Sequence, residues 1–331
     1  MSFSRFVHAM GRGPGRARSL TQAEAQEAMS LMLQDKAPPE AVGALLMLMR
    51  YRGESPEEVA GFAAAARVHA QGWAQTGAAL DWPAYAAGRS RGLPWFLLSA
   101  RLLARAGFPV LIHGFTANAG ALSDPATQLD AAGIPAVRTP AEAAAALAEA
   151  GIAYAPLSAV SPDLLRLLKL REVLGLRSAV NTVARMLNPA GAAATVQGVF
   201  HPPYRELQQE AARLLGQPAF CALKGGGGEF ERHPGKAVTL YRLADAKPLK
   251  ENAPSRLAEA RRLAEGPAEG LTLGALWRGE ARDAFAEALV LGTAAAALLT
   301  CGAAPSLEAA EARAAALWSD RSEASARGDA A

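Results

Sequence analysis

Cysteine and aromatic residues are scarce in this chain of 331 residues. It contains 2 cysteines, Cys221 and Cys301, and 6% of its residues are aromatic. Two cysteines build no disulfide framework and match no zinc-ligand spacing, so we expect a reducing, cytoplasmic environment. Few aromatic residues among many alanines favour helices over a β-sandwich or a β-barrel.

Long apolar runs are also rare. Residues 1–20 are basic and glycine-rich, so we expect no export signal there. The uncharged stretch Ala288–Leu307 is interrupted by Gly292, Gly302 and Pro305, which favours a buried core helix over a membrane span. With 51% apolar and 20% charged residues, the chain is expected to fold into one or two soluble domains and not to remain disordered.

Acidic residues are missing from two basic stretches and nearly missing from a third. Residues 1–20 and 82–123 each carry four arginines and no acid, and residues 164–205 carry six lysines or arginines against Glu172 alone. The formal net charge is nevertheless only +3, because acids crowd into residues 251–329. Solvated helix faces explain any one stretch equally well, but the three together predict a positive surface that attracts a polyanion.

The first 70 residues have the pattern of short amphipathic helices. Thr21 and Glu24 form a capping-box pattern at the start of a helix that runs toward Leu33. Ser55 and Pro56 are the N-cap and first residue of another helix, and acidic residues follow them, as the helix dipole favours. This part of the chain is therefore predicted to be a small helical bundle.

From about residue 73 the pattern changes to alternating helices and short strands. A further helix is expected to begin at Ser161 and to stop at Gly175. The other expected helices are Pro94–Ala106, Glu142–Ala150 and Tyr204–Leu215, and the expected strands are Phe108–Gly114, Thr195–Phe200 and Phe220–Leu223. Such alternation predicts an α/β fold in which helices connect the strands of one sheet.

Several segments, in the right order over roughly residues 15–300, resemble the anthranilate phosphoribosyltransferase family, which belongs to the nucleoside-phosphorylase-like phosphoribosyltransferases. They are Gly43–Met47, Gly53–Glu58, His113-Gly114, Leu174–Ser178 and Asn188–Ala192. The resemblance implies a helical domain of residues 1–72, completed by residues 163–188, and a larger α/β domain of residues 73–162 and 189–331 with a central, mostly parallel sheet. It also implies a homodimer formed through the helical parts.

The active-site motifs of that family are largely replaced here. The glycine-rich loop that grips the diphosphate of phosphoribosyl diphosphate corresponds to Asp81–Gly92, where proline and bulky side chains replace most glycines. The helix start that holds phosphate and metal corresponds to the apolar segment Pro94–Leu98. The Lys-His-Gly-Asn-Arg segment keeps only His113-Gly114, and the magnesium-binding acid pair keeps only Glu231 or, in another register, Glu229.

These replacements predict that the ordinary reaction is not catalysed. Phosphoribosyl transfer depends on positioning the diphosphate and on magnesium that neutralises its charge, and a lone carboxylate is a poor magnesium site. We therefore expect no cofactor and no catalytic residue. The alternative is a glycosyltransferase or phosphoribosyltransferase with an altered substrate. It would use phosphoribosyl diphosphate and magnesium, and Arg171, which matches the family's aromatic-acid-binding arginine, would bind an anionic acceptor.

The main hypothesis is a basic groove that binds nucleic acid, since cations spaced along a surface suit a chain of phosphates. The residues expected to line it are Arg89, Arg91, Arg101, Arg105, Arg166, Lys169, Arg171, Arg177, Arg185 and Lys224. Trp82 and Tyr85, placed in an exposed loop, could stack on bases, whereas a core position is favoured for Trp95. The segments Asp81–Tyr85, Gly92–Trp95 and Lys224–Glu229 are similar to the YbiB branch of the family, which is associated with nucleic-acid binding.

We thus expect a cytoplasmic, non-catalytic dimer with no membrane segment that binds nucleic acid largely independently of sequence, with DNA favoured over RNA. A third hypothesis is a regulatory or scaffolding partner of another protein. Several of these residues also have simpler explanations. His113 is favoured as a hydrogen-bonded histidine at a strand end, Lys224–Gly228 as a turn between strands, and Glu229 and Glu231 as solvent-facing residues of a strand.

Overall fold

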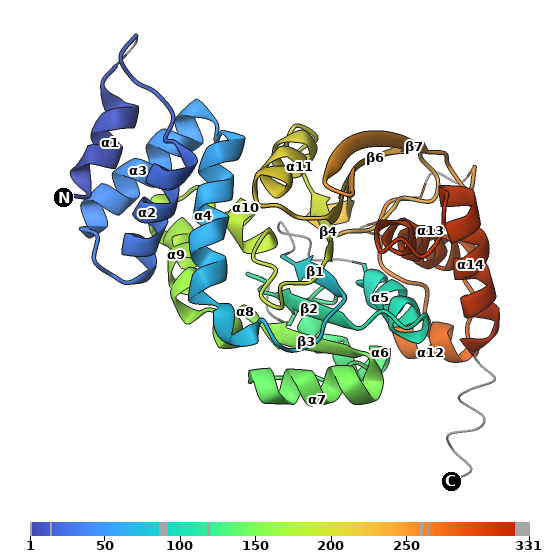
Figure 1. Ribbon diagram of the computed structural model, residues 1–331. Helices are drawn as coiled ribbons and strands as arrows, with labels where there is room; N and C mark the ends of the chain where they lie inside the picture. The colour runs from blue at the N-terminus through green and yellow to red at the C-terminus, as the bar shows by residue number, and fades with distance from the viewer. Residues whose placement is uncertain are drawn as a thin grey trace.

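The computed structural model describes residues 2–13, 15–85, 92–117, 120–258, 261–263 and 265–321. The helices α1 (Ser4–Gly11), α2 (Gln22–Leu33), α3 (Pro39–Arg52) and α4 (Pro56–His69) form a bundle at one end of the molecule (Figure 1). Two helices from the middle of the chain join it, because α9 (Pro162–Leu174) packs on α2 and α10 (Val180–Arg185) packs on α4. The residue boundaries between the two domains stay a prediction.

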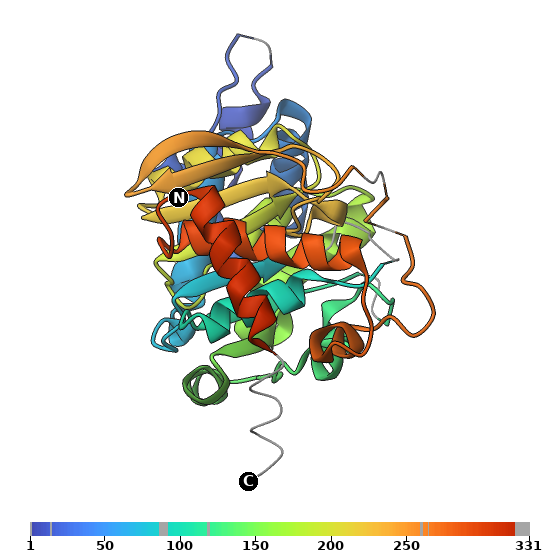
Figure 2. The same cartoon turned by 90° about the vertical axis from the view of Figure 1, so that its right-hand side faces the viewer.

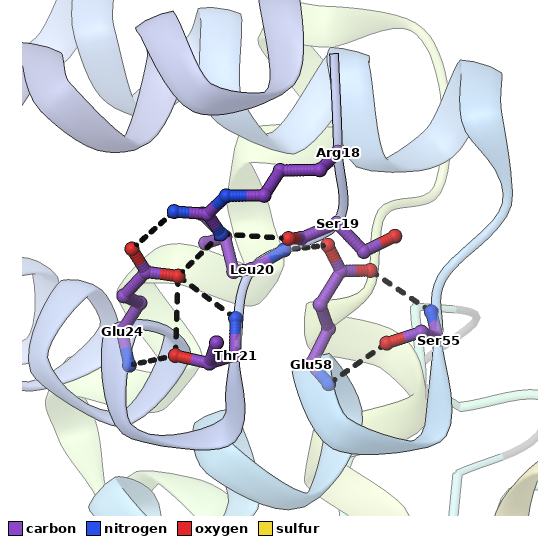
Figure 3. A network of polar contacts seen from close by, with 7 residues as sticks. All are labelled: Arg18, Ser19, Leu20, Thr21, Glu24, Ser55 and Glu58. Carbon is purple, nitrogen blue, oxygen red and sulfur yellow. Dashed lines mark hydrogen bonds and ion pairs between the residues drawn. The ribbon is translucent and has the colours of Figure 1, made fainter. Parts of the chain in front are cut away.

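Two capping boxes start the helices α2 and α4, as Figure 3 shows. The backbone N–H of Glu24 donates to Thr21 Oγ1 over 3.2 Å, and the backbone N–H of Thr21 donates to the Glu24 carboxylate over 2.9 Å. Ser55 and Glu58 repeat this arrangement, and the Glu58 carboxylate also accepts the N–H of Leu20 over 2.8 Å. One buried carboxylate therefore joins the starts of both helices, and the capping box predicted for Thr21 and Glu24 is confirmed.

The larger part of the molecule is built on one seven-stranded sheet with the order β3-β2-β1-β4-β5-β6-β7. The strands are β1 (Leu80–Ala84), β2 (Val110–Gly114), β3 (Ile152–Pro156), β4 (Ala194–Val199), β5 (Ala219–Lys224), β6 (Val238–Ala244) and β7 (Lys247–Ala253). The pairs β3–β2, β2–β1, β1–β4 and β4–β5 are parallel, while β6 and β7 form an antiparallel hairpin at the edge of the sheet. The prediction of an α/β fold with a mostly parallel sheet is confirmed.

Helices cover both faces of the sheet, which leaves two apolar clusters. One cluster is continuous with the helical bundle and includes Leu111, Ala153 and residues of α7 (Pro140–Ala150), α8 (Leu157–Val160) and α11 (Tyr204–Leu214). The other includes Trp82, Ile112 and residues of α5 (Phe96–Arg105), α6 (Leu129–Ala132), α12 (Leu273–Arg278), α13 (Ala284–Thr300) and α14 (Leu307–Ser319). Strands buried on both faces are typical of parallel sheets.

The uncharged stretch Ala288–Leu307 is largely the buried helix α13, against which α14 packs as it crosses (Figure 2). Asp283 caps this helix, since its side chain accepts the backbone N–H of Ala286 over 2.8 Å. The prediction of a core helix is confirmed. Among the described residues, no helix combines the length and the apolar composition that a bilayer crossing requires. Short 3-10 turns complete the fold at η1 (Gln71–Trp73), η2 (Pro125–Thr127) and η3 (Gly226–Gly228).

Candidate functional site

A cavity of ≈ 350 Å³ lies where the carboxyl ends of β1 and β2 meet the helices α9 and α10. Tyr85 and Phe115, the residues that follow these two strands, supply its aromatic wall. The opposite wall consists of residues from α9, from the turn after it and from α10, namely Leu168, Lys169, Arg171, Glu172, Arg177, Asn181 and Arg185. Ligands of open α/β sheets commonly bind at the carboxyl ends of the strands, and ligand sites are frequent between domains.

Four cations line this cavity, and the helix α9, the turn after it and the helix α10 carry them. Lys169 and Arg171 are exposed on α9, which ends at Gly175 in a left-handed conformation with φ of 69°. The chain can then turn sharply, because glycine adopts positive φ without a steric cost. This turn carries the half-buried Arg177, and the half-buried Arg185 is the last residue of α10.

The cations are poorly neutralised by the protein. Among the ion pairs of the described residues, none involves Lys169, Arg171, Arg177 or Arg185. Burial and the neighbouring guanidinium groups of Arg171 and Arg50 lower the pKa of Arg177. Like charges therefore converge on Arg177, and an anion in the cavity would relieve their repulsion.

Arg185 has a structural role in addition to its charge. Its guanidinium donates to the backbone carbonyls of Asn181, over 2.9 Å, and of Tyr85. It thus ties α10 to the residue that leaves β1, across the wall of the cavity. Burial lowers the pKa of Arg185, while the nearby Glu229 carboxylate opposes this effect.

Behind Tyr85 lies a buried chain of polar side chains that crosses three strands. The Tyr85 hydroxyl and His113 Nδ1 are 2.8 Å apart, and Thr195 Oγ1 donates to Asp81 Oδ2 over 2.9 Å. His113 Nε2 lies 3.2 Å from Asp81 Oδ1, although the two atoms are not aligned for a hydrogen bond. Burial raises the pKa of Tyr85 well above its ordinary value, so its hydroxyl stays protonated.

The contacts of His113, Trp82 and Tyr85 test two predictions made for these residues at the ends of strands. His113 is hydrogen-bonded and fully buried, which confirms its interpretation as a partnered histidine. The placement of Trp82 and Tyr85 in an exposed loop is wrong, because Trp82 lies within β1 and Tyr85 directly follows it, and both side chains are buried. Trp82 is therefore unavailable to stack on a base, and Tyr85 can be reached only from the cavity that it lines.

The start of α5, where the resemblance places phosphate and metal, is filled by the protein's own groups. The Trp82 ring stacks on Phe96 at 6.0 Å and meets Phe230 edge-on at 5.5 Å, and all three side chains are fully buried. The Glu231 carboxylate accepts the backbone N–H of Phe96 over 3.3 Å. A carboxylate thus occupies a helix start that could otherwise attract an anion. The prediction that Trp95 belongs to the core is confirmed, since it joins the same apolar cluster.

The expectation that Glu229 and Glu231 face solvent from a strand is wrong. Both are buried, with 1% and 0% of their surface exposed, and no strand covers them. Their segment follows the 3-10 turn Gly226–Gly228 and runs tightly against the sheet. A side chain on Gly198 would come within 2.0 Å of the Glu229 backbone, so the glycines are what permits this close approach.

A magnesium diphosphate does not fit the described residues at this point. Within the described ranges, no three or more His, Cys, Asp or Glu side chains converge as metal ligands. The Glu231 carboxylate is buried and accepts the N–H of Phe96, whose ring stacks on Trp82. Because hard divalent cations need several oxygen ligands, these residues offer no site for the metal that the resemblance implies.

The structure brings together only some of the predicted groove residues. Lys169, Arg171, Arg177 and Arg185 share the cavity, whereas Arg89 and Arg91 lie outside the described residues. The remaining four, Arg101, Arg105, Arg166 and Lys224, do not line this cavity, and three of them have partners elsewhere.

The partners of these arginines are structural. Arg101 covers the Trp277 ring at 4.1 Å and donates to the carbonyl of Ala132 over 3.0 Å. Arg105 donates to the carbonyl of Asp320 over 3.2 Å. Arg166 pairs with Asp35 at 3.2 Å and donates to the carbonyl of Met32 over 2.9 Å, and Lys224 is exposed at the end of β5.

A second cavity of ≈ 90 Å³ adjoins the first, because both are lined by Arg177, Asn181 and Arg185. Its other lining residues include Arg50, Phe200, His201 and Tyr204. The Tyr204 hydroxyl donates to the Glu54 carboxylate over 2.9 Å, and burial raises its pKa to about 12. Arg50 and Tyr204 lie in ordinary helical patterns and carry no signal of a site in the sequence, whereas Asn181 closely follows the family segment Leu174–Ser178.

Known proteins with related sequences share one name. Residues 7–70 match the helical bundle domain of the glycosyl transferase family. The chain is 32% identical over 215 residues to anthranilate phosphoribosyltransferase of Symbiobacterium thermophilum, which covers 63% of this chain and 61% of that relative. With the Methanosphaerula palustris enzyme it shares 30% over 213 residues, and the match likewise spans less than two thirds of that relative, 62%. A longer match, 29% over 304 residues, covers 87% of this chain and 86% of the Rubrobacter xylanophilus enzyme.

Solved structures show the same fold. Anthranilate phosphoribosyltransferase from Thermus thermophilus matches 97% of this chain and 95% of its own chain with a TM-score of 0.80 at 23% identity. The Saccharomyces cerevisiae enzyme in complex with PRPP and Mg matches 97% of this chain and 94% of its own with a TM-score of 0.72 at 14% identity. At such identities the likeness establishes the fold alone. The chain thus matches the glycosyl transferase family over its helical bundle, and it is similar to anthranilate phosphoribosyltransferases in sequence and in overall fold.

Proposed function

We propose that this chain is a phosphoribosyltransferase-like protein with an altered substrate, which binds an anionic aromatic acceptor in the cavity around Arg171. One observation carries the proposal. In a single cavity of ≈ 350 Å³, an aromatic wall faces four cations, and none of these cations forms an ion pair with a described residue. That volume lies within the range of roughly 300–1,000 Å³ that is typical of small-molecule sites. The names of the relatives support a transferase over a nucleic-acid-binding protein.

The two walls suit the two ends of such a ligand. Arginine forms charge-assisted hydrogen bonds to carboxylates in a planar, two-point geometry, and Arg171 is exposed in the cavity lining. Tyr85, Phe115 and Leu168 supply apolar surface against which a flat ring can pack. Glu172 is the one acid in the lining, and it repels negative charge of a ligand at the side of the cavity where Glu172 lies.

The donor side supports a change of substrate. In place of a diphosphate and its metal, the described residues hold Trp82, Phe230 and the Glu231 carboxylate. A second anion would be repelled by Glu231 at the start of α5. The ordinary donor is therefore expected to bind weakly, and the absence of the ordinary reaction stays a prediction.

Calorimetric titration with anthranilate tests the acceptor site. Replacing Arg171 with glutamine should weaken binding about 10- to 100-fold, which is the usual effect of losing a charged hydrogen-bond partner. The matched control is Arg213→Gln on α11, which removes an arginine paired with Glu210 at 2.6 Å, away from both cavities, and should leave affinity within about twofold. Equal affinity of the wild-type protein and Arg171→Gln would contradict the proposal.

Nucleic-acid binding is the second candidate. It is favoured by the unpaired cations that continue from the first cavity to Arg50 in the second. A short oligonucleotide should then raise the melting temperature more than anthranilate does. A plot of the logarithm of the binding constant against the logarithm of the salt concentration should also become less steep, by about one unit of slope for each phosphate-binding cation removed. An affinity that does not change with salt would exclude this candidate.

A further inference from the structure

The two neighbouring cavities share one wall that includes the cations Arg177 and Arg185, and Arg177 is close to the guanidinium groups of both Arg171 and Arg50. We infer that Arg177 stands between two anion subsites, so that the preferred ligand carries two anionic groups. This inference rests on the proposed function, because it takes the first cavity as the acceptor site. What is new is that the second cavity serves as a further subsite, and that the second anionic group of the ligand determines specificity.

Each subsite has a cation of its own besides the shared ones. Lys169 and Arg171 line only the first cavity, and Arg50 lines only the second. Arg50 Nη1 lies 3.5 Å from the Tyr204 hydroxyl, at the limit of a hydrogen bond. Within the described part of the chain, this is the only side-chain hydrogen bond of Arg50, so its other N–H groups can serve a ligand.

Electrostatics link the two subsites. The pKa of Arg177 is lowered by burial and by both flanking guanidinium groups, Arg171 on one side and Arg50 on the other. Two acids are nearby, Glu172 in the first lining and Glu54 beyond Tyr204, and neither forms an ion pair with Arg177. One anion would neutralise only one side of this row of charges, so a ligand with two anionic groups is favoured.

The position of Arg177 is fixed by the backbone on both sides. Gly175 closes α9 by donating its N–H to the carbonyl of Arg171 over 2.9 Å. The N–H of Ser178 donates to Asn181 Oδ1 over 3.2 Å, which starts α10. Arg177 lies between these two bonds on a short turn, so its backbone need not be ordered when a ligand binds.

Pairs of ligands that differ by one anionic group test the inference. The probes are benzoate against benzene-1,4-dicarboxylate, and adenosine monophosphate against adenosine 3′,5′-bisphosphate, so that carboxylate and phosphate chemistry are separated. Dissociation constants come from calorimetry on the full chain at low salt. In at least one pair, the ligand with two anionic groups should bind roughly 10-fold more tightly or better.

Substitutions then assign the subsites. Arg50→Gln should bring the ratio of the two dissociation constants toward one, Arg171→Gln should weaken both ligands of a pair, and Arg177→Gln should do both. The control Arg213→Gln should leave the ratio unchanged, and circular dichroism verifies that each variant is folded. A ratio near one in the wild-type protein, or a ratio that Arg50→Gln does not change, would overturn the second subsite. If instead no probe binds at all, the proposed acceptor site fails together with it.

Discussion

Replacing Arg177 with glutamine should raise the melting temperature of the ligand-free protein. Arg177 is half-buried, no described acid pairs with it, and Arg50 and Arg171 repel it. At an effective dielectric constant of about 20, two unit charges about 8 Å apart repel each other by roughly 2 kcal/mol. Because Arg50 and Arg171 are exposed to water, we expect a net gain of only about 1 kcal/mol. For a chain of 331 residues, that gain corresponds to a rise of roughly 1–2 °C.

Scanning calorimetry at two ionic strengths separates this repulsion from other effects. The gain should be largest near 20 mM salt and should shrink near 500 mM, where the screening length is only a few ångströms, about 4 Å. The same variant should bind anionic ligands more weakly, which is the trade between stability and function expected of a binding site. Arg213→Gln, which removes a paired arginine, should not stabilise the protein at either ionic strength. A fall in the melting temperature of Arg177→Gln at low salt would refute the argument.

Three further predictions concern the helical bundle and the filled donor side. Glu58→Ala should lower the free energy of unfolding, measured in urea titrations, by about 2–3 kcal/mol, because the N–H groups of Leu20 and Ser55 lose their acceptor. A loss below about 0.5 kcal/mol would contradict this role of the two hydrogen bonds. The hydrogen bonds from Arg18 lower the pKa of Glu24 to about 2, so the stability that this pair contributes is present above about pH 4.5 and is lost as the pH falls toward 2. Arg18→Gln should flatten that part of the pH profile, and an unchanged profile would exclude the pair as its cause. Trp82→Ala should cost about 3–5 kcal/mol, whereas an exposed Trp82 would cost far less.

The helical bundle could be predicted from the sequence because its signals are local. Capping residues, helix-opening prolines and the glycine after α9 each act within one turn of the chain, and the structure has them where the pattern indicates. The strands were harder to find. The β6–β7 hairpin was missed because its turn, Asp245 and Ala246, adopts positive φ values of 49° and 61° without the glycine that normally marks such a turn.

The candidate site depends on contacts that no local pattern reveals. Arg171 was found through a family motif, while Arg50 comes from the end of α3, far away in sequence. The burial of Trp82 has no local signal, because the proline-containing segment Asp81–Pro83 looks like a loop although it belongs to the interior strand β1. Glu229 and Glu231 are buried because their backbone packs closely against the sheet, where glycines such as Gly198 leave room for it.

The most direct test of the account is a crystal structure of the protein with anthranilate at saturating concentration. The account predicts that the carboxylate lies within hydrogen-bond distance of the guanidinium of Arg171 or Arg177, with the ring against Tyr85 or Phe115. A ligand bound elsewhere, with this cavity holding only water, would contradict it.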